Sequence, residues 1–220
     1  MTSSLAGWIP VILVLAALAA VYLPFGNYMA RVFQSDHHTV VERGLYRVIG
    51  VNGDGRQNWM RYATSVFGFS LVSLLFLYLL QRVQQWLPLA HGVDAIDPDQ
   101  AWNTAVSFVT NTNWQSYSGE QAMSQLTQMA GLAVQNFVSA AVGISVAVAL
   151  MRGLANKSGD GLIGNFWVDV TRTIFRILLP VAAVVAVLLL TQGVIQNFAA
   201  PHTVETFTGG SPVSYTHLTL

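Results

Sequence analysis

The sequence contains no cysteine, and only 9% of its 220 residues are charged. The lack of cysteine excludes a disulfide framework and metal sites built from thiolates. The charged fraction is far below the roughly 25% of an ordinary globular domain. Ten cationic and ten anionic residues cancel to a net charge of zero, so nothing indicates a nucleic-acid partner.

Apolar residues are what the sequence has in excess, at 53% of the chain. A hydrocarbon core of roughly 30 Å is crossed by about 20 helical residues. Four segments are apolar over such a length: Leu5–Phe25, Tyr62–Leu80, Ser124–Leu150 and Thr173–Val194. They predict an all-α integral membrane protein. The first segment is too long for a signal-peptide core and follows no cationic residue, so we expect it to be retained.

The cationic residues are distributed unevenly around these spans. Nine of the ten lie on one side: Arg31, Arg43, Arg47, Arg56, Arg61, Arg152, Lys157, Arg172 and Arg176. Arg82 lies on the other side, together with five acids: Asp94, Asp97, Asp99, Glu120 and Glu205. Because cytoplasmic loops are enriched in Lys and Arg, the N-terminus and the connection 83–123 are predicted to be external.

The external connection 83–123 contains a shorter apolar stretch, Ala101–Thr110. About ten residues cannot span the membrane but suit a re-entrant half-helix, and Asp97 and Asp99 precede it as N-terminal caps. The next residues, "TNTNWQSYSGE", are polar and almost uncharged. Non-helical backbone at membrane depth must be buried in protein or line a water-filled cavity. The layout predicts a pore loop; the alternative is an amphipathic interfacial helix followed by a surface turn.

The centres of the four spans lack charged residues, and every histidine lies in a connection: His37, His38, His91, His202 and His217. This excludes a proton relay and a haem held between facing helices. Neutral oxygen remains as the means of binding an ion, as in the carbonyl rings of potassium filters. The carboxyl end of a short helix adds a favourable negative partial charge. We therefore predict that the backbone carbonyls of Thr110, Asn111, Thr112 and Asn113 bind K+.

The same residues carry a resemblance to a known family. The runs "NTAVSFVTNTNWQSYSGE" and "MSQLTQMAGLAVQNFVSAAVGI" resemble the potassium-binding subunit (KdpA type) of the bacterial potassium-transporting P-type ATPase. "VERGLYRVIGV" and "GNFWVDVTR" fit the cytoplasmic loops of that family. The resemblance extends from about Trp8 to Val213. It implies a fold similar to pore-loop potassium channels, with four repeats of helix, pore loop and helix.

The resemblance also implies a function. The chain would be the potassium-binding and translocating subunit of an ATP-driven uptake pump, with K+ as the transported ion and no organic cofactor. It would not hydrolyse ATP, which is expected of a separate P-type ATPase catalytic subunit. The resemblance also implies small accessory membrane subunits and membrane lipid as partners. It implies the bacterial inner membrane as the location. A passive potassium channel or symporter subunit of the same architecture is the alternative.

Several side chains near the loop are further candidates for the site. The resemblance implies that Gln115 helps to pass the ion onward at the inner mouth; the alternative is a hydrogen bond to the loop backbone. Trp114 is expected to support the filter. The third predicted span carries a polar stripe that either backs the filter or packs helices together, formed by Gln128, Gln135 and Ser139, with Gln135 and its neighbour Asn136 expected to touch the loop.

The predicted organisation includes an internal repeat. "NWMRYATSVF" and "NFWVDVTRTIF" each open a span with an amide, an aromatic residue and an arginine, and "QQWLP" and "QNFAAP" close the same spans. A second filter would begin near residue 220, where the chain instead ends in "GGSPVSYTHLTL". We expect the chain to be truncated in the second repeat; a natural short paralogue is the alternative.

The expected segments follow from these features. In order they are an extra transmembrane helix, a cytoplasmic loop, the first helix/pore-loop/helix repeat, a second cytoplasmic loop, the first helix of the second repeat with an external segment, and a foreign or mis-joined tail. Their ranges are 1–25, 26–61, 62–150, 151–172, 173–213 and 214–220.

Overall fold

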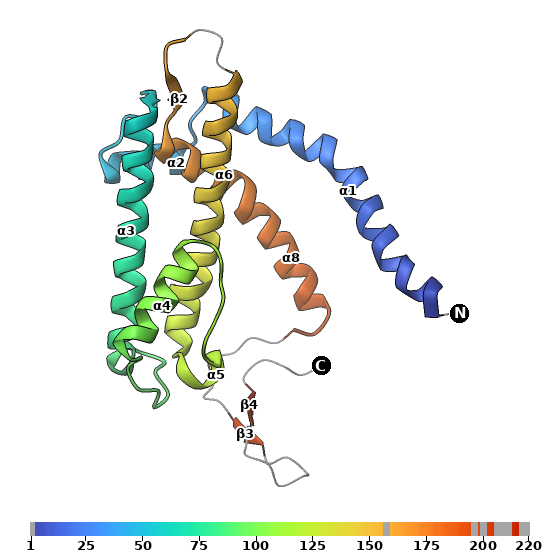
Figure 1. Ribbon diagram of the computed structural model, residues 1–220, viewed down its shortest axis with the longest axis vertical. Coiled ribbons are helices and arrows are strands. Elements are labelled where there is room, and N and C mark those ends of the chain that lie inside the picture. Colours follow the sequence, from blue (N-terminus) through green and yellow to red (C-terminus); the bar gives the residue numbers. More distant parts are fainter. Residues whose placement is uncertain (1–2, 156–158, 195–197, 199–201, 205–212, 216–220) are drawn as a thin grey trace. The chain divides into compact units, whose positions relative to one another are not determined.

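The computed structural model describes residues 3–155, 159–194, 198, 202–204 and 213–215 (Figure 1). The chain divides into two units, Met1–Asp54 and Gly55–Leu220. The expectations for the last residues of the tail and for the closing motif "QNFAAP" fall largely outside the described residues.

The first unit contains two helices, α1 (Ser3–Gln34) and α2 (Val40–Ile49). α2 lies within the predicted cytoplasmic loop and begins with a reciprocal cap. The Glu42 amide donates to the Thr39 hydroxyl at 3.3 Å, and the Glu42 carboxylate accepts from the Thr39 amide at 2.8 Å. Gly50, with a φ of 69°, ends the helix in the left-handed conformation that glycine adopts without strain.

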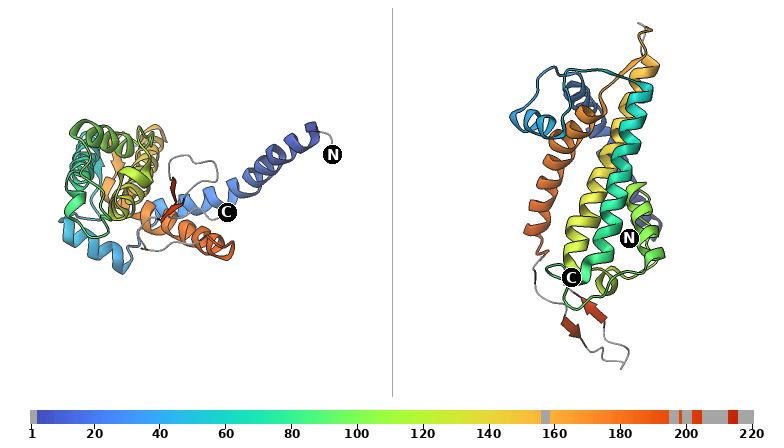
Figure 2. Two further views of the ribbon diagram at one scale, coloured as in Figure 1. Left: turned by 90° about the horizontal axis from the view of Figure 1, so that it is seen from below. Right: turned by 90° about the vertical axis from the view of Figure 1, so that its left-hand side faces the viewer.

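The second unit is built around two long helices that run side by side, α3 (Trp59–Val83) and α6 (Val134–Ala155), with α4 (Pro98–Val109) packed across them (Figures 1 and 2). Short helical turns extend or join these helices: η1 (Gln84–Trp86), α5 (Gly119–Ala122) and the π-helical η2 (Thr127–Ala133). The last span is formed by α7 (Phe166–Arg172), the π-helical η3 (Thr173–Leu178) and α8 (Leu179–Thr191). Four short strands complete the unit: β1 (Gln57–Asn58), β2 (Leu162–Gly164), β3 (His202–Val204) and β4 (Val213–Tyr215).

Four helices of the described chain are long and apolar enough to cross a membrane, as predicted. They are Gly7–Gln34, Trp59–Trp86, Thr127–Ala155 and Phe166–Thr191. The fourth begins at Phe166 rather than at the predicted Thr173, because Asn165 caps it by accepting a hydrogen bond from the Trp167 amide at 3.1 Å. Protein rather than solvent surrounds this first turn, since the Phe166 side chain is fully buried.

The predicted short helix is present as α4, but it starts earlier than the apolar pattern indicated and is capped differently. Asp97 occupies the N-cap position without a capping hydrogen bond from its side chain, and Asp99 lies inside the first turn. The prediction was therefore right that Asp97 lies at the N-cap position, but wrong that its side chain caps the helix and that Asp99 precedes it. Pro98 begins the helix instead, where its missing N–H costs nothing, and Asp99 lies where the helix dipole favours a negative charge.

One apolar core holds α4 in place. Its buried members are Leu77 on α3, Leu132 on η2, Met123 and Ile96 in the connections, and Ala101, Ala105 and Phe108 on α4 itself. The small alanines let α4 approach the longer helices closely. A half-helix of twelve residues is thus anchored by packing on one face, which fixes where its carboxyl end lies.

The starts of the two spans that share the amide–aromatic–arginine motif meet in a small antiparallel sheet. β1 pairs with β2, so that Gln57 faces Gly164. Asn58 and Asn165 occupy equivalent positions, because each caps the helix that follows. The Gln57 side chain also accepts from the Phe166 amide at 2.9 Å. The sequence echo at the start of these spans therefore corresponds to a shared structural role.

A buried ion pair joins three helices near this sheet. The carboxylate of Asp169 on α7 accepts a hydrogen bond from Arg152 on α6 at 2.7 Å. The Tyr62 hydroxyl on α3 lies 3.1 Å from the same carboxylate and 2.8 Å from the carbonyl oxygen of Ser145. The Asp169 side chain is only 1% exposed. The buried carboxylate is stabilised mainly by Arg152, while the single Tyr62 proton is shared between this carboxylate and the Ser145 carbonyl.

We predict that Asp169→Ala destabilises the protein by about 3–5 kcal/mol, because it removes the carboxylate that neutralises the largely buried Arg152 guanidinium. Tyr62→Phe removes one hydrogen bond and should cost about 1 kcal/mol. Thermal unfolding in detergent measures both effects. The matched control is Asp160→Ala, which removes the solvent-exposed partner of Arg56 and should change stability by about 0–1 kcal/mol. Equal losses for Asp169→Ala and Asp160→Ala would contradict the structural role of the buried pair.

Candidate functional site

The loop that follows α4 is held by hydrogen bonds that run back into the helix. The amide of Asn111 donates to the carbonyl oxygen of Phe108 at 3.2 Å. The amides of Thr112 and Asn113 both donate to the carbonyl oxygen of Ser107, at 3.0 and 3.2 Å. Three successive N–H groups therefore point toward the last turn of α4.

The direction of these N–H groups determines where the carbonyls point. In a planar trans peptide the C=O is antiparallel to the N–H of the following residue. The carbonyls of Thr110, Asn111 and Thr112 consequently face away from α4. Among the described residues, none donates a hydrogen bond to the carbonyl oxygens of Thr110–Asn113. These oxygens are available to an external ligand.

Two asparagines make this backbone path possible. Asn111 and Asn113 have φ angles of 58° and 57°, in the left-handed region. Asparagine tolerates this region better than other residues with a Cβ, because its short side chain forms local hydrogen bonds. The alternation "NTN" therefore has a conformational explanation that the sequence analysis did not identify.

Ser107 organises the loop and was not among the predicted site residues. Its side chain is fully buried. Its carbonyl oxygen accepts from the hydroxyl of Thr112 at 2.9 Å as well as from the two loop amides. Its own hydroxyl donates to the carbonyl oxygen of Trp114, also at 2.9 Å. The only sequence signal for this role is a small hydroxyl residue in the last turn of an apolar half-helix.

The third span reaches the loop through Ser139. The buried Ser139 hydroxyl donates to the side-chain oxygen of Asn111 at 3.2 Å. Gln135 is buried in α6, whereas the Asn136 side chain is exposed and its carbonyl lies 3.4 Å from the Ser139 hydroxyl. Gln128 instead stabilises the C-terminal end of the connection 83–123, where its side-chain amide donates to the carbonyls of Gly119 and Met123.

Trp114 and Gln115 follow the loop with exposed side chains. Trp114 lines a shallow hollow of about 350 Å³ with Asp99, Trp102, Asn103 and Val106. Gln115 lies beside the hydroxyl of Tyr117, whose oxygen is buried although the residue as a whole is only half-buried. Burial raises the pKa of this hydroxyl, and the neighbouring Thr104 and Gln115 side chains lower it to a smaller extent. Tyr117 therefore remains neutral at physiological pH.

Two glutamines at the end of the second span brace both sides of α4, and the sequence analysis did not find them. The fully buried Gln84 donates to the carbonyls of Asp94 and Ala122, at 2.6 and 2.9 Å, and accepts from the Ser124 amide at 3.1 Å. Gln81, also fully buried, donates to the carbonyl oxygen of Ala101 on α4 at 3.2 Å. The connections before and after α4 are thus hydrogen-bonded to the same end of the second span.

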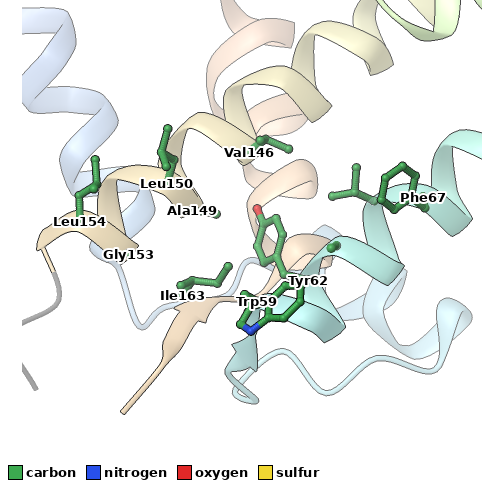
Figure 3. A pocket seen from close by; sticks show the side chains of 11 residues that line it. Trp59, Tyr62, Phe67, Val146, Ala149, Leu150, Gly153, Leu154 and Ile163 are labelled. Atoms are coloured by element: carbon green, nitrogen blue, oxygen red, sulfur yellow. The ribbon is translucent and has the colours of Figure 1, made fainter. Parts of the chain in front are cut away.

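Thr110–Asn113 themselves offer an ion neutral oxygen, from backbone carbonyls, hydroxyls and amide side chains. In the part of the chain that the structure describes, no group of three His, Cys, Asp or Glu side chains could hold a metal ion. The apolar groove of about 410 Å³ between α3 and α6 is unsuitable, because aromatic and aliphatic side chains such as Trp59, Phe67 and Leu150 line it (Figure 3). The free carbonyls of Thr110–Asn113 are the better candidate.

Comparisons with known proteins show which proteins this chain resembles over most of its length. The family model described as "Potassium-transporting ATPase A subunit" (KdpA) matches residues 12–216. The chain is 56% identical over 206 residues to the potassium-transporting ATPase potassium-binding subunit of Kineococcus radiotolerans, which covers 94% of this chain and 37% of that protein. Proteins of the same name from Streptomyces coelicolor and Rhodococcus opacus are 55% and 58% identical, covering 96% and 90% of this chain and 38% and 35% of their own lengths. The chain thus spans little more than a third of these relatives.

We predict that Gln84→Ala loosens the connections on both sides of α4. The change leaves the Ser124 N–H and two carbonyls without this partner, and each buried group left unpaired costs about 1–3 kcal/mol. Faster hydrogen exchange at Ser124 and faster proteolysis within 87–97 and 110–123 are the expected results. The control is Gln85→Ala, which truncates the exposed neighbouring glutamine and should leave both rates unchanged. Indistinguishable behaviour of the two variants would show that Gln84 is not a brace.

Proposed function

The chain belongs to the family of the potassium-transporting ATPase A subunit, and from this premise we propose that it supplies a potassium-selecting pore loop to an ATP-driven uptake pump. In this proposal the carbonyl oxygens of Thr110, Asn111, Thr112 and Asn113 replace part of the hydration shell of K+. The segment 62–150 forms one helix/pore-loop/helix unit. The chain binds and conducts the ion, and a separate P-type ATPase subunit hydrolyses ATP.

One observation carries this proposal: the loop amides are bonded back to α4, so that free carbonyls face the other way. Hydrogen bonds to Ser107 and Phe108 occupy the donors of Asn111, Thr112 and Asn113. The acceptors on the opposite side have no partner among the described residues. A row of carbonyls without donors suits a weakly hydrated monovalent cation, because no net negative charge is needed to hold it.

The orientation of α4 adds electrostatic support. The helix ends at Val109, so its negative partial charge lies directly beside the loop. This partial charge attracts a cation without binding it too tightly to be released. An anionic side chain in the same place would favour small or divalent cations more strongly.

The setting that we propose follows from the charge distribution and from the relatives' names. The excess of cationic residues around 26–61 and 151–172 assigns these segments to the cytoplasm and the N-terminus to the outside. A bacterial inner membrane, an ATPase catalytic subunit and small accessory membrane subunits complete the assembly. A passive potassium channel or symporter subunit would use the same loop, but the relatives' common name favours the pump.

The exposed residue Gln115 has a separate role in this proposal. It follows Trp114, whose carbonyl is already bonded to Ser107, so it lies just beyond the row of free carbonyls. Its amide could therefore receive the ion as it leaves the filter. Trp114, Gln128, Gln135 and Asn136 support the loop or its surroundings.

We predict that Asn111→Asp lowers the discrimination between K+ and Na+ in the complete pump. The substitution keeps the oxygen that accepts from Ser139, so its main effect is the added charge. A unit charge 4 Å from the ion contributes about 4 kcal/mol at an effective dielectric constant of about 20, for either cation. ATPase stimulation titrated with K+ and with Na+ measures the ratio. Gln121→Glu, on the exposed surface of α5, is the control; unchanged discrimination in Asn111→Asp would mean that the loop is only structural.

A fixed cation at Gln115 should abolish transport if this residue lies on the ion path. We predict that Gln115→Arg eliminates potassium-stimulated ATPase activity, since two like charges at 4 Å repel by about 4 kcal/mol at an effective dielectric constant of about 20. Gln121→Arg adds the same charge to a nearby exposed glutamine and should retain activity. Normal stimulation of Gln115→Arg would remove this residue from the path and favour a bracing role beside Tyr117.

A further inference from the structure

The loop Thr110–Asn113 is held at two points by serine hydroxyls that lie outside it. Side chains from Asn111 to Ser116 are exposed, so packing contributes little to the position of the loop. The Ser107 hydroxyl bonds the carbonyl of Trp114 at the end of the carbonyl row. The Ser139 hydroxyl bonds the side chain of Asn111 near its beginning. We name these two contacts the exit clamp and the entry clamp.

The exit clamp determines how many carbonyls are free. The carbonyl of Trp114 already accepts a hydrogen bond at 2.9 Å, whereas the four carbonyls before it accept none from the part of the chain that the structure describes. Removing the hydroxyl would release the Trp114 carbonyl and the backbone that follows Asn113. The row of free carbonyls would then include the Trp114 oxygen as well, and the backbone at the end of the row would no longer be held in position.

The entry clamp acts on a residue in a restricted conformation. Asn111 has a φ of 58°, and its side-chain oxygen is fixed by a hydroxyl that is itself buried on α6. The bond joins the loop to a second helix, so the position of the loop is fixed relative to α6 as well as to α4. Without it, the Asn111 peptide could rotate toward the more common right-handed region.

We propose that Ser107 and Ser139 are positioning residues that determine ion selectivity, an inference that rests on the potassium-filter function proposed above. Neither hydroxyl touches the ion. Together the clamps stop the carbonyl row from contracting around a cation smaller than K+. A clamped row discriminates by the spacing of its oxygens, whereas a free row adapts to Na+ and binds it with little penalty.

The test uses the complete pump, with the partner ATPase subunit, carrying Ser107→Ala or Ser139→Ala. Loss of about one hydrogen bond should lower the ratio of half-maximal Na+ to K+ concentrations for ATPase stimulation by about tenfold. The maximal rate with saturating K+ should remain within about twofold of the unmodified pump, because the carbonyl ligands remain present. Ser107→Cys and Ser139→Cys keep a weak donor of similar size and should give intermediate ratios.

The matched control is Ser145→Ala. Ser145 is a fully buried serine of α6 whose hydroxyl donates to the carbonyl of Ala141 at 2.7 Å, away from the loop. It reports the cost of losing a buried hydroxyl, and its ion ratio should stay unchanged. If an alanine variant fails to assemble with the ATPase subunit, the cysteine variant at the same position decides the question.

Two results would overturn the proposal: unchanged ion ratios in both clamp variants, or an equal change in Ser145→Ala. Failure of the potassium-filter function itself is recognised separately. In that case Asn111→Asp and Gln115→Arg would also leave the potassium response unaltered. If those two variants respond and the serine variants do not, the filter function stands and the clamps are rejected.

Discussion

The rest of the site depends on how the backbone donors beyond α4 are satisfied. The backbone N–H groups that follow the end of a helix need new acceptors, because an unpaired N–H that is buried away from water costs free energy. Here the carbonyls of Ser107 and Phe108 accept the donors of Asn111, Thr112 and Asn113. Since each peptide is planar, this solution for the donors also directs the carbonyls outward. The same hydrogen bonds that stabilise the loop therefore leave a row of carbonyls that faces away from α4.

The helices around α4 determine where this loop lies in the protein. α4 is only twelve residues long, and an isolated helix of this length is marginally stable. Packing against α3 and α6 and the bonds from Gln81 and Gln84 compensate for this. At the opposite end of the unit, the Asp169 pair and the β1–β2 sheet join the same long helices. Both ends of the α3–α6 pair are thus fixed.

The predictable features were those that the hydrophobic pattern encodes directly. Runs of about 20 apolar residues indicated the four spans, and the short run after residue 100 indicated α4. The residues that brace the site were missed for a physical reason. A serine or glutamine side chain can bond many different carbonyls, and nothing local indicates that Ser107 will bond Trp114 or that Gln84 will bond Ala122.

The sequence alone determined that this is a membrane protein with a polar, uncharged loop after a half-helix, because hydropathy and charge depend only on composition along the chain. It also determined the family, since the loop residues are distinctive. The tertiary structure decided that the fourth span begins at Phe166, that Asp97 and Asp99 are not side-chain caps, and that Ser139 is the residue of α6 that bonds Asn111. These are contacts between distant segments, and their geometry exists only once α3, α4 and α6 have packed together.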